Sequence, residues 1–162
     1  MVMDKLLQLL SVNSDLSYGE MATMLNESEE TIKNKIAQYE KDGVIKGYKA
    51  IINYDKLEGA KATAYIELKV TPQKDTGFDT IAKQIMDFDE VDSVYLMAGA
   101  YDILACVKGD NITDIAMFVA TRVSTLDGVL STNTRFQLKT YKKSGISFYD
   151  DEEEQDKRSI VL

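Results

Sequence analysis

The chain has 162 residues, 44% of them hydrophobic and 28% charged, which is typical of a folded globular protein, and its apolar runs fall far short of the roughly 20 residues that span a bilayer. It contains no histidine and one cysteine, Cys106, which excludes His-dependent acid–base catalysis, a Cys–His nucleophile, an intrachain disulfide and a four-cysteine zinc site. The net charge is −8, and residues 150–162 supply half of it with six acids against two bases, so we expect a solvated acidic tail there.

Three helices are predicted in the first third of the chain. The first has one apolar face, made of Met3, Leu6, Leu7 and Leu10, and it ends near Asn13. Ser17 and Glu20 form a capping box that starts a second, short helix. Ser28 is placed to cap a third helix, which buries Ile32, Ile36 and Tyr39 and ends before Gly43, where a left-handed residue is expected.

A short helix, a three-residue turn and a longer helix are typical of a helix-turn-helix. Lysine pairs with phosphate or guanine, and asparagine with adenine. The candidate DNA contacts on or beside the outward face of the third helix are Ser28, Thr31, Lys33, Asn34, Lys35 and Gln38. A three-helix packing unit with a polar surface fits the same spacing, and the acids Glu27, Glu29 and Glu30 lead into this helix, so both interpretations stay open at this point.

The rest of the chain alternates strands and helices. A β-rich stretch at 48–52 leaves the helical domain as a strand or linker. The predicted elements that follow are a strand over 62–70, a helix capped by Thr76 with Asp79, strands over 91–97 and 101–108, a helix capped by Asn111, and a long strand over 129–141. This βαββαβ order is the ferredoxin-like arrangement. The expected domains are 1–54 and 55–149, followed by the tail 150–162.

A sheet covered by helices on one face leaves its other face open. Because the strands are apolar, we expect that face to be an exposed apolar patch, which usually marks a partner surface. The sequence therefore predicts at least a homodimer with its sheets packed face to face. Cys106 lies on a predicted strand and is expected to be a buried small side chain.

Three motifs occur in order and carry a specific resemblance. They are Ser17-Tyr-Gly-Glu20-Met21-Ala22, then Ser28 to Ile45 with Lys35-Ile36 and Gly43-Val44-Ile45 inside it, and Gly99-Ala-Tyr101-Asp102. Over residues 3 to about 142 the chain resembles the Lrp/AsnC family, the leucine-responsive or feast/famine transcription regulators. Lys35 stands where an arginine is usual in that family, and Tyr39 replaces a leucine. The resemblance implies an α+β protein with an N-terminal helix-turn-helix (winged-helix-like) domain and a C-terminal ferredoxin-like βαββαβ sensing domain.

The resemblance also implies partners and an effector site. The partners are double-stranded DNA, a small-molecule effector such as an amino acid, and further copies of the chain in a homodimer, tetramer or octamer. The implied effector site consists of Gly99, Ala100, Tyr101 and Asp102, with hydroxyls from Thr132 and Thr134. Backbone N–H groups beside Gly99 suit a carboxylate, and Asp102 can balance an ammonium group. A turn-stabilising role for Tyr101 and Asp102, and plain β-propensity for the threonines, are the alternatives.

Two other functions are alternatives to a DNA-binding regulator. Sirohaem decarboxylases share the two-domain fold, but their chemistry depends on histidine, which this chain lacks. A sensing or assembly module without DNA binding is supported only by the acids before the third helix. We expect no enzyme activity, cofactor, metal or membrane partner. The N-terminus shows no basic segment before an apolar stretch, which predicts no signal peptide and a cytoplasmic location.

Overall fold

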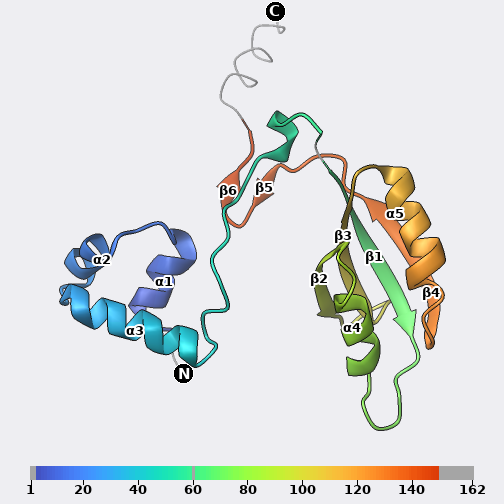
Figure 1. Ribbon diagram of the computed structural model, residues 1–162, viewed down its shortest axis with the longest axis horizontal. Coiled ribbons are helices and arrows are strands. Elements are labelled where there is room, and N and C mark those ends of the chain that lie inside the picture. The colour runs from blue at the N-terminus through green and yellow to red at the C-terminus, as the bar shows by residue number, and fades with distance from the viewer. Residues whose placement is uncertain (1–2, 60, 150–162) are drawn as a thin grey trace, which may run out of the picture. The chain divides into compact units, whose positions relative to one another are not determined.

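The computed structural model describes residues 3–59 and 61–149, which divide between two compact units (Figure 1). The helical unit runs to Ile52 and also includes Lys143–Ser147, while the sheet unit holds Asn53–Lys142 and continues from Phe148. The division after Ile52 therefore falls two residues before the boundary expected after residue 54, and residues 143–147, expected in the second domain, belong to the helical unit. The predicted acidic tail lies outside the described residues.

The three predicted helices are present, with their predicted caps. They are α1 (Lys5–Val12), α2 (Tyr18–Leu25) and α3 (Glu29–Lys41). Ser17 and Glu20 form the capping box of α2, and Ser28 accepts a hydrogen bond from the backbone N–H of Thr31 at the start of α3. Gly43 follows α3 with a φ of 69°, the left-handed conformation that glycine adopts without steric cost.

The helices bury one small apolar core. Its fully or nearly buried members are Leu6, Met21, Ala22, Ile32 and Ile36, from all three helices. Residues 44–53 after α3 form no strand, so the β-rich stretch is a linker and not a strand. A short hairpin of β5 (Lys142–Lys143) and β6 (Ile146–Ser147) comes at the end of the described chain.

The sheet unit has the predicted βαββαβ order. After the short 3₁₀ turn η1 (Tyr54–Lys56), the elements are β1 (Ala62–Val70), α4 (Asp79–Met86), β2 (Val91–Leu96), β3 (Ile103–Gly109), α5 (Ile112–Phe118) and β4 (Val129–Phe136). The four strands pair in the order β2-β3-β1-β4, every neighbour antiparallel. A π-helical turn, η2 (Val119–Val123), extends α5.

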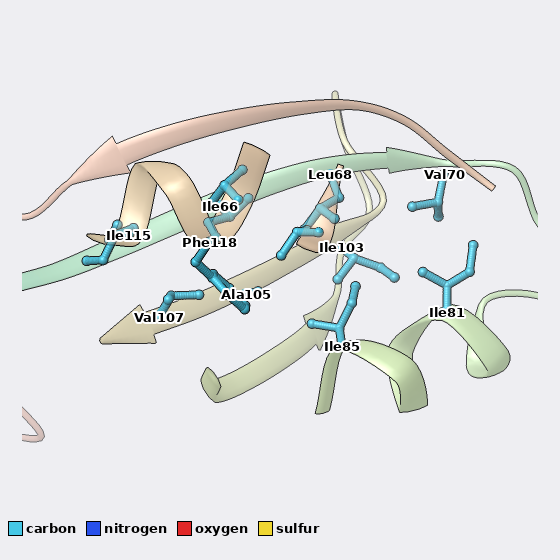
Figure 2. Packing of buried hydrophobic residues seen from close by; sticks show 13 residues of the cluster. Ile66, Leu68, Val70, Ile81, Ile85, Ile103, Ala105, Val107, Ile115 and Phe118 are labelled. Carbon is cyan, nitrogen blue, oxygen red and sulfur yellow. The ribbon is translucent and has the colours of Figure 1, made fainter. Parts of the chain in front are cut away.

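Both helices of the sheet unit cover the same face of the sheet. Alternate residues of β1, from Ala64 to Val70, are buried together with side chains of α4 and α5. Figure 2 shows Ile81 and Ile85 of α4 pointing toward the strands, with Ile115 and Phe118 coming from α5. This packing fixes which side chains of each strand lie on the uncovered face, because the side-chain period of a strand is two.

Four expectations from the sequence are wrong in detail. The last strand ends at Phe136 and not at Tyr141, and β3 begins at Ile103 and not at 101. Thr76 does not cap α4: Phe78 is the N-cap residue, without a side-chain hydrogen bond, and the Thr76 hydroxyl instead contacts Gln73 and Thr80. The helix predicted after Asn111 is an α-helix only to Phe118.

The uncovered face of the sheet is also less apolar than expected. Strand alternation sends the aliphatic side chains of β1 to the helices, so the other face carries Tyr65 and Glu67. The cross-strand register adds Cys106 and Leu104 from β3 and Arg135 and Asn133 from β4. The face is therefore mixed, with tyrosines and an ion pair side by side. Cys106 is buried, as predicted.

The longest helix of the described residues has 13 residues. None of the described helices combines the length and apolar character that crossing a bilayer requires.

Candidate DNA-contact surface and effector loop

The turn before α3 is held by its own hydroxyl groups. Ser28 Oγ accepts from the Thr31 N–H at 3.1 Å and lies 2.8 Å from Thr31 Oγ1. Both hydroxyls are exposed, yet each is already engaged with the other. Ser28 and Thr31 therefore shape the start of the helix first, and any contact with a phosphate would compete with this bond.

Lys33 and Asn34 are the two predicted contacts that point outward without a protein partner. Both side chains are exposed, and within residues 3–59 and 61–149 neither one forms a hydrogen bond or an ion pair. Gln38, one turn further along, donates its amide to Asp42 Oδ1 at 2.7 Å. On the outward face of α3, the Lys33 ammonium and the Asn34 amide can thus bind an external partner, while the Gln38 amide is hydrogen-bonded at the end of its own helix.

Lys35 is engaged within the helical unit. Its Nζ lies 2.7 Å from Glu27 Oε1, in the turn between α2 and α3. The hydrogen bond that Lys35 donates to Glu27 is the main cause that raises the pKa of the Lys35 ammonium group. Lys35 therefore differs from Lys33, although the sequence predicts the same role for both.

The acids before α3 do not all act on its outward face. Glu27 is paired with Lys35. The Glu29 carboxylate lies beside Gly19 in the first turn of α2, where its Oε1 would be 3.0 Å from the Cβ of any larger residue. Glu29 and Glu30 occupy the first turn of α3, where negative charge suits the helix N-terminus.

The predicted effector loop joins β2 to β3 and is anchored through Asp102. The backbone N–H of Asp102 donates to the carbonyl of Leu68 at 2.9 Å, and its carbonyl accepts from Met97 N at 2.8 Å. Its carboxylate Oδ2 accepts from the N–H of Val70 at 2.9 Å, where the pairing of β1 and β4 shifts register. Asp102 thus has a structural role in holding the loop to β1.

The tip of this loop is open. Gly99 and Ala100 are exposed, and no described atom lies within 4 Å of a Cβ built at Gly99. Its φ of 159° is close to extended. The open space around Gly99, and not an unusual backbone conformation, is therefore what would allow a ligand to approach the loop. Tyr101 is half-buried, on the chain just before the Asp102 anchor.

Thr132 lies near the end of the sheet that carries the loop, Thr134 lies opposite the middle of β1, and both face the helices. Thr132 pairs with Leu68 and Thr134 with Ile66, both of which are in the core. The Thr132 hydroxyl is 3.4 Å from that of Ser124. In the described part of the chain no hydrogen bond joins either threonine to the loop. Asp102 and Thr132 lie on opposite sides of Leu68 in β1.

A charged cluster on the uncovered face was not predicted. Arg135 Nε and Nη2 lie 2.8 and 3.2 Å from the two oxygens of Glu67, and Asn133 donates to the same carboxylate at 2.8 Å. The Arg135 hydrogen bond is the main cause that lowers the pKa of Glu67. The same hydrogen bond to Glu67 is the main cause that raises the pKa of Arg135. Only a correct register between β1 and β4 would have revealed the cluster.

One hollow of about 490 Å³ in the sheet unit lies away from this loop. Its lining includes Lys61, Glu90, Lys108 and Phe118, at the end of β3 opposite to Asp102. Within residues 3–59 and 61–149, no three acidic or cysteine side chains come together in a way that could hold a metal ion.

A helix-turn-helix joined to a βαββαβ domain defines a class: DNA-binding regulators with a separate ligand-binding domain. Comparison with known proteins gives the family. Residues 63–146 match the Lrp/AsnC ligand binding domain. The chain is 40% identical over 158 residues to the HTH-type transcriptional regulator YugG of Bacillus subtilis, covering 97% of this chain and 94% of that protein. The chain belongs to the Lrp/AsnC family and is a DNA-binding transcriptional regulator, as the motifs predict.

Further relatives and solved structures agree. The HTH-type transcriptional regulator LysM of Sulfurisphaera tokodaii is 35% identical over 137 residues, 85% of this chain and 93% of that one. The structure of E. coli AsnC superposes with a TM-score of 0.68 at 24% identity, covering 88% of this chain and 97% of that chain. A regulator of Neisseria meningitidis in complex with L-Met gives a TM-score of 0.70 at 22% identity, covering 93% and 99%. These two structures support the fold.

Proposed function

We propose that the outward face of α3 reads DNA through Lys33 and Asn34, and that an amino acid bound at the loop 99–102 alters assembly or DNA geometry. The observation that carries the first part is the exposure of Lys33 and Asn34 without a partner among the described residues. A lysine there neutralises a phosphate, and an asparagine can pair with adenine in the major groove. Candidates for contacts with the DNA phosphate backbone lie beside them: Ser28, Thr31 and Gln38.

The uncovered sheet face supports a homodimer. It carries the half-exposed Tyr65 beside the Glu67–Arg135 pair, and tyrosine and arginine are enriched in protein interfaces. A two-fold dimer would present two copies of α3 to half-sites about one DNA turn apart, roughly 34 Å. Assembly of dimers into tetramers or octamers is the next expected level.

An amino-acid effector is supported by the chemistry of the loop. Its tip is open around Gly99, exposed backbone N–H groups can hold a carboxylate, and Asp102 supplies a negative charge near an incoming ammonium. The Neisseria relative is described with L-Met bound, which favours the same ligand class here. The Val70 hydrogen bond to Asp102 connects such a ligand directly to β1. We further propose that the protein works in the cytoplasm and catalyses no reaction.

Three measurements test the proposal. Fluorescence anisotropy with a labelled duplex from the gene's own upstream region, beside a random duplex of equal length, should show tighter binding to the upstream region. Equal affinity for both duplexes would contradict a sequence-reading role at this promoter. Light scattering at micromolar concentration should give at least twice the 18.2 kDa chain mass, and a monomer would remove the half-site geometry. Thermal shift with each of the twenty amino acids should identify at least one stabilising ligand.

A further inference from the structure

Lys35 lies on the flank of α3 and not on its outward face. It comes three residues after the buried Ile32 and directly before the buried Ile36, a spacing that places it beside the core stripe of a helix. From there its Nζ reaches Glu27 Oε1 at 2.7 Å, across eight residues of sequence. The pair therefore joins α3 to the turn that precedes it.

A second polar link lies one helical turn further along the same flank. Tyr39 donates its hydroxyl to Asp4 Oδ2 at 2.7 Å, across 35 residues of sequence. Asp4 is the N-cap of α1, so this bond joins α3 to the start of the first helix. Residues four apart in a helix are neighbours on its surface, so Lys35 and Tyr39 lie side by side on α3. The Tyr39 hydrogen bond, and to a smaller extent the Lys35 charge, lower the pKa of Asp4. We call Asp4, Glu27, Lys35 and Tyr39 the α3 clamp.

The clamp makes a DNA contact by Lys35 unfavourable. The Glu27 carboxylate is only 30% exposed, and its Oε2 is buried without a hydrogen-bond partner. If Lys35 turned toward a phosphate, this carboxylate would lose the one counter-ion that it has among the described residues while staying largely out of water, which is costly. Lys33, two residues earlier, can approach a phosphate without breaking any bond within the described residues.

We propose that Lys35 makes no contact with DNA and instead acts as a positioning residue, fixing α3 against the turn and α1 so that Lys33 and Asn34 meet the groove in one orientation. This inference rests on the DNA-binding function proposed above. It predicts that the sign of the charge at position 35 does not affect DNA affinity or sequence preference, provided that the ion pair with position 27 is kept.

A charge swap separates positioning from contact. The variants are Lys35→Glu, Glu27→Lys and the double variant that exchanges the two, with Lys33→Glu as the control because it has the same charge change on the same helix. Each is measured for Tm, for affinity to the upstream and random duplexes well below its Tm, and for the slope of log K against log salt. The ratio of the two affinities reports orientation of the helix, which a merely structural pair would leave unchanged in the folded protein.

The expected results differ sharply between the two lysines. Lys35→Glu should lower both Tm and the preference for the upstream duplex, and adding Glu27→Lys should restore most of both with a wild-type salt slope. Lys33→Glu should reduce affinity at least tenfold with little change in Tm. If the double variant regains its Tm but binds DNA as poorly as Lys35→Glu, Lys35 is a direct contact and the inference is wrong. An unchanged Tm in Lys35→Glu also overturns it. If the wild type prefers neither duplex, the proposed reading of DNA fails, while the Tm values still decide whether the pair exists.

Discussion

Replacing Tyr39 by phenylalanine isolates one bond of the helical unit. The aromatic ring, which packs against the core of Leu6, Ile32 and Ile36, is kept, and only the 2.7 Å hydrogen bond to Asp4 is lost. A hydrogen bond to a charged group contributes about 1.5–3 kcal/mol when buried, but both partners here are partly exposed, so water replaces much of it. We expect a loss of about 1 kcal/mol at neutral pH, or a fall in Tm of about 4–8 °C for a unit of this size.

The sign of the pH dependence follows from the two pKa shifts. The hydrogen bond lowers the pKa of Asp4 below its ordinary value of 3.8, and it raises that of Tyr39 above 10.0. A lowered carboxyl pKa gives stability that is present above the unfolded value and is lost as the pH falls through the folded one. A raised phenol pKa gives stability that is present below the unfolded value and is lost as the pH rises through the folded one. The stability lost in Tyr39→Phe should therefore be largest between the ordinary pKa values of Asp4 and Tyr39, and it should shrink at lower and at higher pH.

The assay is hydrogen exchange of α1 and α3 peptides by mass spectrometry in the full chain, because exchange resolves one unit from the other. Tyr48→Phe is the matched control: it removes a longer bond, 3.1 Å, from an exposed tyrosine to Glu40, and should cost less than half as much. If Tyr39→Phe costs no more than Tyr48→Phe, or if its cost at pH 3 equals that at pH 7, the hydrogen bond is not what links α3 to α1.

Three further variants test the other parts of the molecule. Lys33→Ala should weaken binding to all duplexes and lower the magnitude of the salt slope by about 1, measured by anisotropy across a salt series; an unchanged slope would exclude a phosphate contact. Ile66→Ala should cost about 2–5 kcal/mol in urea unfolding, since Ile66 is fully buried, and a loss below 1 kcal/mol would contradict the packing. Asp102→Asn should keep the fold, because an amide oxygen still accepts from Val70, but should weaken the thermal shift given by the best amino acid; a wild-type response would make the carboxylate purely structural.

Local signals in the sequence were enough to predict the caps and the element order. Ser17 with Glu20, Ser28 and Asn111 each cap the helix expected, because a cap depends on residues within one turn of it. The βαββαβ order followed from periodicity in the same way. The predicted strand ends were less accurate. The alternation of side chains continues to Leu138, but β4 stops at Phe136 because its pairing with β1 ends at Phe136. Alternation alone does not hold a strand.

The side-chain partners of the candidate site could not be predicted, because each pair joins residues that only the tertiary fold brings together. Glu67 with Arg135 depends on the register between two strands, and Asp4 with Tyr39 depends on how α1 crosses α3. Gln38 with Asp42 and Ser28 with Thr31 are exceptions, since spacings of four and three residues along a helix are visible in the sequence. The sequence therefore predicts which residues are polar and outward, but not which of them are already occupied.

This distinction changes the electrostatics expected at the DNA surface. Counted along the sequence, residues 31–49 hold five lysines against two acids, which suggests strong attraction to phosphate. The structure removes Lys35 from that count, because its charge is neutralised by Glu27, and it leaves Glu30 exposed near the start of the same helix. Since binding to random DNA comes almost wholly from phosphate neutralisation, one copy of α3 should hold DNA weakly. In the dimer proposed above, two copies on one duplex would raise that affinity, so we expect DNA binding to depend on assembly and on the proposed effector.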